Sequence, residues 1–198
     1  ALLFFLADTY WFGINVKTYV LGFLALCGVA SYLAFIVKCF CHRSRSTIDV
    51  AILHFMASVV ILILAVLVLP FIIFHELKAD PMAIKYTTIY GSLIIMGWIS
   101  TLILGKTFKI LPYVLWAKHY QRNLASVVVP RPADLFKEGL LKMQFAAFLI
   151  FFGCFFAGLL FDSGFFLNFG LFSFLITSLV YFTNVMITVW HKPKNTGK

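Results

Sequence analysis

Residues 49–74 read DVAILHFMASVVILILAVLVLPFIIF, an apolar run whose one charged residue, Asp49, stands at its first position. A helix needs roughly 20 apolar residues to cross about 30 Å of hydrocarbon, so this run predicts a membrane-spanning helix. Four further runs of the same kind occupy 18–40, 84–105, 141–162 and 164–190. We therefore expect an all-α, polytopic transmembrane helix bundle of five spans, forming a single transmembrane domain over 1–198.

The composition excludes a soluble globule. The chain is 63% hydrophobic and 12% charged, whereas ordinary domains carry about twice that charge. A net charge of +9 would suggest nucleic acid in a soluble protein. Here the basic residues border the apolar runs, where they meet anionic lipid headgroups. We expect a lipid bilayer as the partner of the chain, and no nucleic acid.

The basic residues are divided unevenly between the two faces of the membrane. If the chain crosses at every run, thirteen of its sixteen lysines and arginines fall on one face. Positive residues are enriched on the cytoplasmic side, so the face that carries 41–48, 106–140 and the C-terminus is predicted to be cytoplasmic. The other face receives Lys17, Lys78 and Lys85, and the thirteen are Lys38, Arg43, Arg45, Lys106, Lys109, Lys118, Arg122, Arg131, Lys137, Lys142, Lys192, Lys194 and Lys198.

The chain opens with ALLFFL, and no basic residue precedes this apolar stretch, which is unlike a signal peptide. We interpret 1–6 as the outer end of an earlier helix. Two possibilities stay open, a five-span bundle and the C-terminal part of a longer one.

The region 106–140 is predicted to form an interfacial elbow. Pro112 is expected to kink or restart the helix that leaves the third span. Beyond it, Tyr113 and Trp116 interleave with Lys118, a mixture suited to the headgroup layer. Asp134 is predicted to be the N-cap of a segment 135–162 that enters the bilayer.

Small and polar residues mark the expected contacts between helices, because helices associate in lipid through close packing and hydrogen bonds. On the fifth span a polar stripe at helical spacing shares one face and should point into the bundle, toward partner helices, a polar pathway or a cofactor. The small residues are Gly97, Thr101 and Gly105 on the third span and Gly153 and Ala157 on the fourth, and the polar stripe is Ser173, Thr177, Tyr181, Asn184 and Thr188.

His54 is the one histidine clearly inside a predicted span. Imidazole is a common metal ligand and an axial haem ligand, which makes His54 the candidate cofactor-binding residue. The alternative is a hydrogen bond to a neighbouring helix. All seven acidic residues fall at span ends or in connections, which argues against ion translocation by these helices.

Two other groups of residues have weaker claims to chemistry. Cys39, Cys41 and His42 form a C-x-C-H cluster whose spacing fits neither a zinc site nor covalent haem attachment. We interpret these cysteines as reduced interfacial residues. His75 beside Glu76 is interpreted as a pair at the outer interface.

Residues 90–116 read YGSLIIMGWISTLILGKTFKILPYVLW. With its Gly97-Trp98 pair and the elbow from Gly105 to Pro112, this stretch resembles bacterial membrane proteins distantly similar to subunit I of haem-copper oxidases and nitric oxide reductases. The resemblance covers roughly 49–140 and includes a histidine in the preceding helix, as at His54. It implies a haem-binding or formerly haem-binding bundle in the bacterial cytoplasmic membrane, associated with respiration and with other membrane subunits.

The reaction of that family needs several histidines on facing helices, and no span here holds more than one clear candidate. Whether the chain is an enzyme is left open. We expect a subunit of a respiratory or redox assembly with a scaffold role or a haem-carrying role. The alternatives are a transporter or channel-like bundle, or a purely structural membrane partner of a larger complex.

Overall fold

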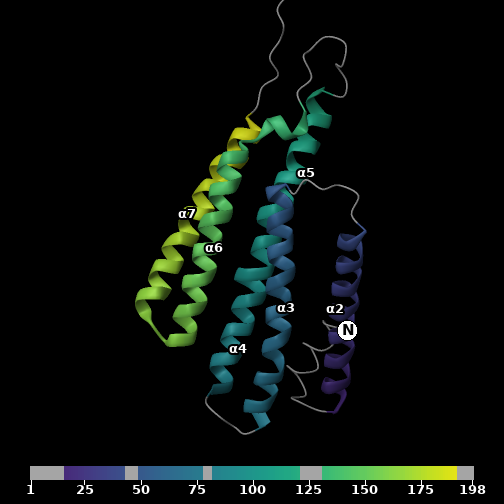
Figure 1. The fold of residues 1–198 in the computed structure, drawn as a ribbon, viewed down its shortest axis with the longest axis vertical. Helices are drawn as coiled ribbons and strands as arrows, with labels where there is room; N and C mark the ends of the chain where they lie inside the picture. The colour runs from purple at the N-terminus through teal and green to yellow at the C-terminus, as the bar shows by residue number, and fades with distance from the viewer. Residues whose placement is uncertain (1–15, 43–48, 78–81, 121–130, 191–198) are drawn as a thin grey trace, which may run out of the picture. The chain divides into compact units, whose positions relative to one another are not determined.

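The structure, a computed structural model, describes residues 16–42, 49–77, 82–120 and 131–190. The predicted all-α fold is confirmed, since the described residues form helices and no strand (Figure 1). The elements are α2 (Val16–Cys41), α3 (Val50–Leu77), α4 (Met82–Ser92), the π-helix η1 (Leu93–Ile99), α5 (Ser100–Tyr120), the 3₁₀ turn η2 (Pro132–Leu135), α6 (Glu138–Phe161) and α7 (Gly164–Val189). The predictions for 1–6 and for the C-terminal tail lie outside the described residues.

Five helical segments in the described part of the chain are long and apolar enough to cross a membrane, as predicted for a multi-pass membrane protein. They are Gly22–Cys41, Val50–His75, Met82–Lys118, Glu138–Phe161 and Gly164–Val189. The chain divides into two compact units, 1–47, which contains α2, and 48–198, which contains the other helices. The single domain over 1–198 stays a prediction.

The third span is longer than predicted, because α4, η1 and α5 follow one another without a break from Met82 to Tyr120. Pro112 lies inside α5 and does not end it. A proline removes one N–H donor, and a helix in a membrane protein tolerates this when neighbouring groups satisfy the freed carbonyl. The first part of the predicted elbow is therefore helix.

Asp134 does not cap the helix that enters the bilayer. Its Oδ2 accepts a hydrogen bond from the backbone N–H of Arg131 at 3.1 Å, and the backbone N–H of Asp134 donates to the Arg131 carbonyl at 2.9 Å. These two bonds close η2, so the carboxylate is used within its own turn. α6 begins at Glu138, after an extended Lys137.

The helices of the second unit pack around two hydrophobic clusters. The larger one contains four phenylalanines of α6 and joins α3, α4, η1, α5 and α6, with Phe148 and Phe151 fully buried. The smaller one groups Val50, Ala51, Phe108 and Leu141. It brings the first turns of α3 and α6 beside the middle of α5. Because Gly105 lies against His54 and the earlier Gly97 against the later Ile61, α3 and the α4–α5 helix run in opposite directions.

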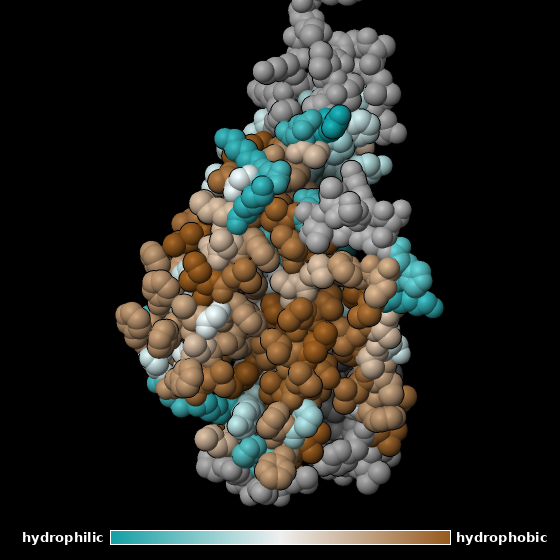
Figure 2. Space-filling view, viewed as in Figure 1, coloured by the Kyte–Doolittle hydropathy of each residue, from teal (hydrophilic) through white to brown (hydrophobic). Residues whose placement is uncertain are grey.

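α6 and α7 form a hairpin whose tight turn at Asp162 has a positive φ of 52° (Figure 1). On the face seen in Figure 2, hydrophobic residues form a broad brown band over the helices, with teal, hydrophilic residues at both ends of the α6–α7 pair. Helices with apolar residues on their outer surfaces and charges at their ends are suited to a lipid bilayer.

Candidate functional site around His54

His54 lies at the centre of a fully buried polar group near the first turn of α3. Its Nδ1 is 3.1 Å from the carbonyl oxygen of Val50, one turn earlier in the same helix. Its Nε2 is 3.2 Å from the side-chain nitrogen of Gln144 on α6. The ring of Phe145 lies beside it, with ring centroids 4.7 Å apart. His54 and Gln144 are both completely buried.

The two contacts assign the proton on the neutral His54 ring. A carbonyl oxygen can only accept, so Nδ1 carries the hydrogen and donates to Val50. Nε2 then holds a lone pair and accepts a hydrogen bond from the Gln144 amide. The Gln144 Oε1 is left buried without a hydrogen-bond partner. Gln144 was missed by the sequence analysis, although an amide inside an apolar span is itself a signal of an interhelical partner.

Glycine at position 105 allows α5 to approach His54 closely. A Cβ atom at Gly105 would lie 2.6 Å from the His54 Cβ and 3.1 Å from the Ala51 carbonyl oxygen. A Cβ at Gly97 would lie 2.6 Å from the Ile61 Cγ2. Thr101, between the two glycines, is fully buried. The small residues noted on the third span therefore lie against α3.

The small residues noted on the fourth span are placed differently. Gly153 is exposed, and a Cβ atom at this position would meet open space out to 4 Å, so it makes no close helix contact among the described residues, while Ala157 is half-buried. The close approach of α6 and α7 falls instead on Gly158, against Leu167, and on Gly170, against Phe155. In a hairpin, residues equally far from the turn face one another. These two glycines fit that register about Asp162, which is the signal that could have found them.

The polar stripe of α7 points inward and is occupied by hydrogen bonds. Ser173 Oγ donates to the Ala147 carbonyl on α6 at 2.8 Å, and the Tyr181 hydroxyl is 3.2 Å from Thr107 Oγ1 on α5. Thr177 and Thr188 donate to carbonyls one turn earlier in α7. These groups join neighbouring helices or their own helix.

Asn184, the amide of that stripe, holds the start of α6. Its Oδ1 accepts from the backbone N–H of Lys137 at 3.1 Å, and its Nδ2 donates to the Lys137 carbonyl at 3.2 Å. Both polar groups of the Asn184 side chain thus bond to the backbone of Lys137. Asn184 fixes the point where the chain passes from η2 into α6.

The residues around His54 do not fit a haem or a metal ion. The Nδ1 contact with a backbone carbonyl is compatible with ligation, but Nε2, the nitrogen left to bind a metal, already contacts Gln144, and α5 lies against the ring through Gly105. The described residues contain no group of three or more His, Cys, Asp or Glu side chains that could hold a metal ion. An iron atom at Nε2 would have to displace Gln144.

The other candidate ligands do not converge either. Cys39 and Cys41 are exposed on α2, and two residues along a helix point about 200° apart. His42 Nδ1 lies 2.9 Å from the carbonyl of Lys38. His75 stacks on Tyr86 of α4, with ring centroids 5.0 Å apart, and the side chain of Glu76 lies outside the described residues.

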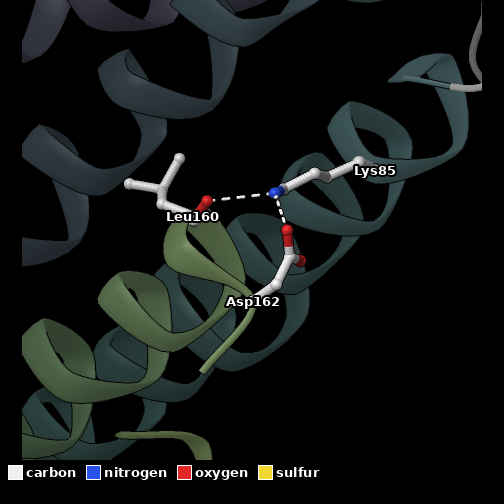
Figure 3. Close-up of polar contacts among 3 residues, drawn as sticks. All are labelled: Lys85, Leu160 and Asp162. Atoms are coloured by element: carbon white, nitrogen blue, oxygen red, sulfur yellow. Dashed lines mark hydrogen bonds and ion pairs between the residues drawn. The ribbon is translucent and has the colours of Figure 1, made fainter. Parts of the chain in front are cut away.

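At the opposite end of the second unit, Lys85 of α4 holds the C-terminus of α6 (Figure 3). Its Nζ donates to the Leu160 carbonyl at 3.0 Å and to Asp162 Oδ2 at 2.5 Å. A cation at a helix C-terminus satisfies free carbonyls and complements the helix dipole. The sequence analysis assigned Lys85 to the face opposite the cytoplasmic one. The turn between the runs 141–162 and 164–190 falls on the same face if the chain crosses at every run, but the sequence does not show that Lys85 and Asp162 pair.

The described residues thus bring His54, Gln144 and Gly105 together at one end of the unit, and Lys85 and Asp162 at the other. Both groups join helices that are distant in sequence, and neither directs several ligands toward one point. Compared with family models, with curated proteins and with solved structures, the chain matches none of them.

Proposed function

We propose that this chain is a non-catalytic, integral membrane scaffold subunit of a larger membrane assembly. One observation carries the proposal: polar side chains within the spans of the second unit are used to join one helix to another. The His54–Gln144 and Ser173–Ala147 contacts are of this kind, and Asn184 of α7 holds Lys137, the residue before α6. Such bonds hold a bundle in one arrangement, which is what a scaffold requires.

The resemblance of residues 90–116 to relatives of haem-copper oxidase subunit I supports a respiratory or redox assembly in a bacterial inner membrane. The charge asymmetry supports an orientation with the C-terminus in the cytoplasm. A haem-carrying role is less well supported than a scaffold role, because a haem at His54 would break the bond to Gln144. A transport path along α7 is less well supported as well, since Ser173, Thr177 and Asn184 are buried and hydrogen-bonded.

The test combines an absorption spectrum with native gel electrophoresis of gently solubilised membranes. We expect the purified chain to show no Soret band, and the chain in gently solubilised membranes to migrate in an assembly larger than its own 22.5 kDa. Gly105→Leu should release the chain from that assembly, because the added side chain collides with His54 and the Ala51 carbonyl. The matched control is Ile103→Leu, at an exposed position two residues earlier on the same helix.

A Soret band that disappears in His54→Ala would replace the scaffold role with a haem-carrying one. If the chain from gently solubilised membranes migrates alone on the native gel, the scaffold role is wrong.

A further inference from the structure

We infer that the last part of α5 carries a docking face for an acidic, amphipathic segment of a partner protein, outside the bilayer. The face consists of Lys109, Ile110, Tyr113, Val114 and Lys118, which we call the α5 docking face. This inference adds the chemistry of a partner to the scaffold function proposed above. It rests on that function only because it requires a partner.

Two lysines delimit the hydrocarbon part of the third span. Lys85 forms its ion pair with Asp162 at one end, and Lys106, exposed at the other end, places its Nζ 4.6 Å from the centre of the Phe55 ring. The two lysines are 21 positions apart, which is about 32 Å at a rise of about 1.5 Å per residue. This length matches the roughly 30 Å of a hydrocarbon core.

α5 continues beyond that limit to Tyr120. The headgroup layer adds about 5–8 Å on each side, which is reached near residue 111. Tyr113 lies about 10 Å past Lys106 along the helix, and Lys118 about 18 Å. An average tilt of about 20° shortens these lengths by less than a tenth.

The neighbouring helices end before this extension. Phe108 packs with Val50 and Ala51, in the first turn of α3, and with Leu141, in the first turn of α6. Residues 109–120 of α5 therefore pass beyond the starts of both helices. Most of the α5 docking face lies where water, rather than lipid, surrounds the helix.

Three apolar residues of this face are nevertheless exposed, with Ile110 60%, Tyr113 61% and Val114 53% accessible. Positions three and four apart share one side of a helix, so Tyr113 and Val114 lie on the same side as Ile110 and the three form one patch. Pro112, which lies away from this patch around the helix, is buried, so the helix already has an inner side. Clustered apolar residues in water mark a site of protein interaction.

Charge indicates the kind of partner. Lys109 and Lys118 are exposed at the two ends of the patch, and the sequence from Met82 to Tyr120 contains no Asp or Glu. Neither lysine forms an ion pair with the residues that the structure describes. A segment with apolar residues flanked by carboxylates complements this face, since opposite charges favour association and like charges oppose it.

The experiment uses the full chain in its native membranes. Tyr113→p-benzoylphenylalanine introduces a photoreactive group on the face, and Ile103→p-benzoylphenylalanine, at a position 51% exposed within the hydrocarbon part of the same helix, is the matched control. We expect position 113 to form one discrete adduct with another polypeptide, and position 103 to form none. Mass spectrometry of the adduct should identify a cross-linked peptide with net negative charge.

The charge-reversed variant Lys109→Glu/Lys118→Glu should reduce that adduct by about tenfold or more. Membrane insertion and thermal unfolding should stay unchanged, because both side chains are exposed. If the reversed variant fails to insert, Lys109→Gln/Lys118→Gln is used in its place, and a smaller but clear loss is expected.

An adduct with lipid at position 113 would show that this part of α5 lies on the membrane, and an adduct with the chain itself would show that the face is already covered. Either result overturns the inference, as does a polypeptide adduct that is unaffected by charge reversal. If the native gel still shows an assembly while position 113 forms no polypeptide adduct, the docking face is wrong and the scaffold function stands.

Discussion

The ring of His54 on α3 lies 3.2 Å from the side-chain nitrogen of Gln144 on α6, and the two residues are ninety positions apart in the chain. The Gln144 amide nitrogen donates this bond, while Oε1 of the same side chain remains unpaired. Gln144 therefore brings both a stabilising and a destabilising contribution to the folded state. Interhelical hydrogen bonds in membrane proteins average about 0.6 kcal/mol, and an unpaired buried carbonyl costs about 1–3 kcal/mol.

The two members of this pair should therefore respond differently to removal. Gln144→Leu nearly keeps the volume, and it exchanges the unpaired Gln144 Oε1 for an unpaired His54 Nε2 while it removes one bond, so the free energy of unfolding should change by less than about 1 kcal/mol. His54→Ala leaves a cavity and an unpaired amide and should cost about 2 kcal/mol or more. Unfolding in mixed micelles measures both. Equal losses in the two variants would contradict this account of the pair.

Nitrogen NMR of the labelled protein in lipid can test the assignment of the ring proton independently. We expect the neutral His54 ring to carry its hydrogen on Nδ1, because the Val50 carbonyl can only accept. In Gln144→Leu the Nδ1–H signal should persist while the Nε2 signal shifts. A hydrogen on Nε2 in the unmodified protein would mean that the Gln144 amide has the opposite orientation.

Gly105 and Gly153 form a matched pair for testing the close contacts. Gly105→Ala should lower the free energy of unfolding by about 1–3 kcal/mol, because the new Cβ meets the His54 Cβ and a backbone oxygen. Gly153→Ala meets open space, and the higher helix propensity of alanine should leave stability unchanged or raise it by up to about 1 kcal/mol. Similar losses in both variants would place the helix contact elsewhere.

Hydropathy and length suffice to predict the spans, because a helix in lipid must be apolar over a fixed distance. The run 164–190 and α7 (Gly164–Val189) agree almost residue for residue. The third span differs because Pro112 and the basic residues after Gly105 suggest an end, whereas α5 continues to Tyr120. A missing N–H donor weakens a helix, but its environment decides whether the helix stops.

The pairing of side chains is harder to predict than the spans. His54 and Gln144 lie near the starts of their helices, so similar depth could have paired them, but depth does not show which faces meet. Gly153 illustrates the same difficulty. It belongs to a small-residue pattern with Ala157, yet the register of the α6–α7 hairpin directs Gly158 and Gly170 to the contact. Register depends on the turn at Asp162, which spacing within one helix does not reveal.

The proposed orientation can be tested with the cysteine at the end of α2. In a variant whose other cysteines are replaced, Cys41 should not react with a membrane-impermeant thiol reagent in intact cells and should react in inverted vesicles. The reason is the excess of basic residues predicted for the cytoplasmic face. In a cysteine-free background, Asp162→Cys should give the opposite pattern, since Asp162 lies exposed in the turn between α6 and α7. Labelling of Cys41 from outside would reverse the topology.

Asp162 combines an unfavourable backbone with a favourable ion pair, so its replacement should have opposite effects in two backgrounds. Its φ of 52° suits glycine better than any other residue, but its carboxylate accepts from Lys85. Lys85→Met should cost about 1 kcal/mol, because the Leu160 carbonyl and Asp162 lose their donor. Asp162→Gly should then be stabilising in the Lys85→Met protein and neutral or destabilising in the unmodified one. Unfolding of the two single variants and the double variant measures this coupling, and an identical effect of Asp162→Gly in both backgrounds would show that the Lys85–Asp162 ion pair contributes nothing to stability.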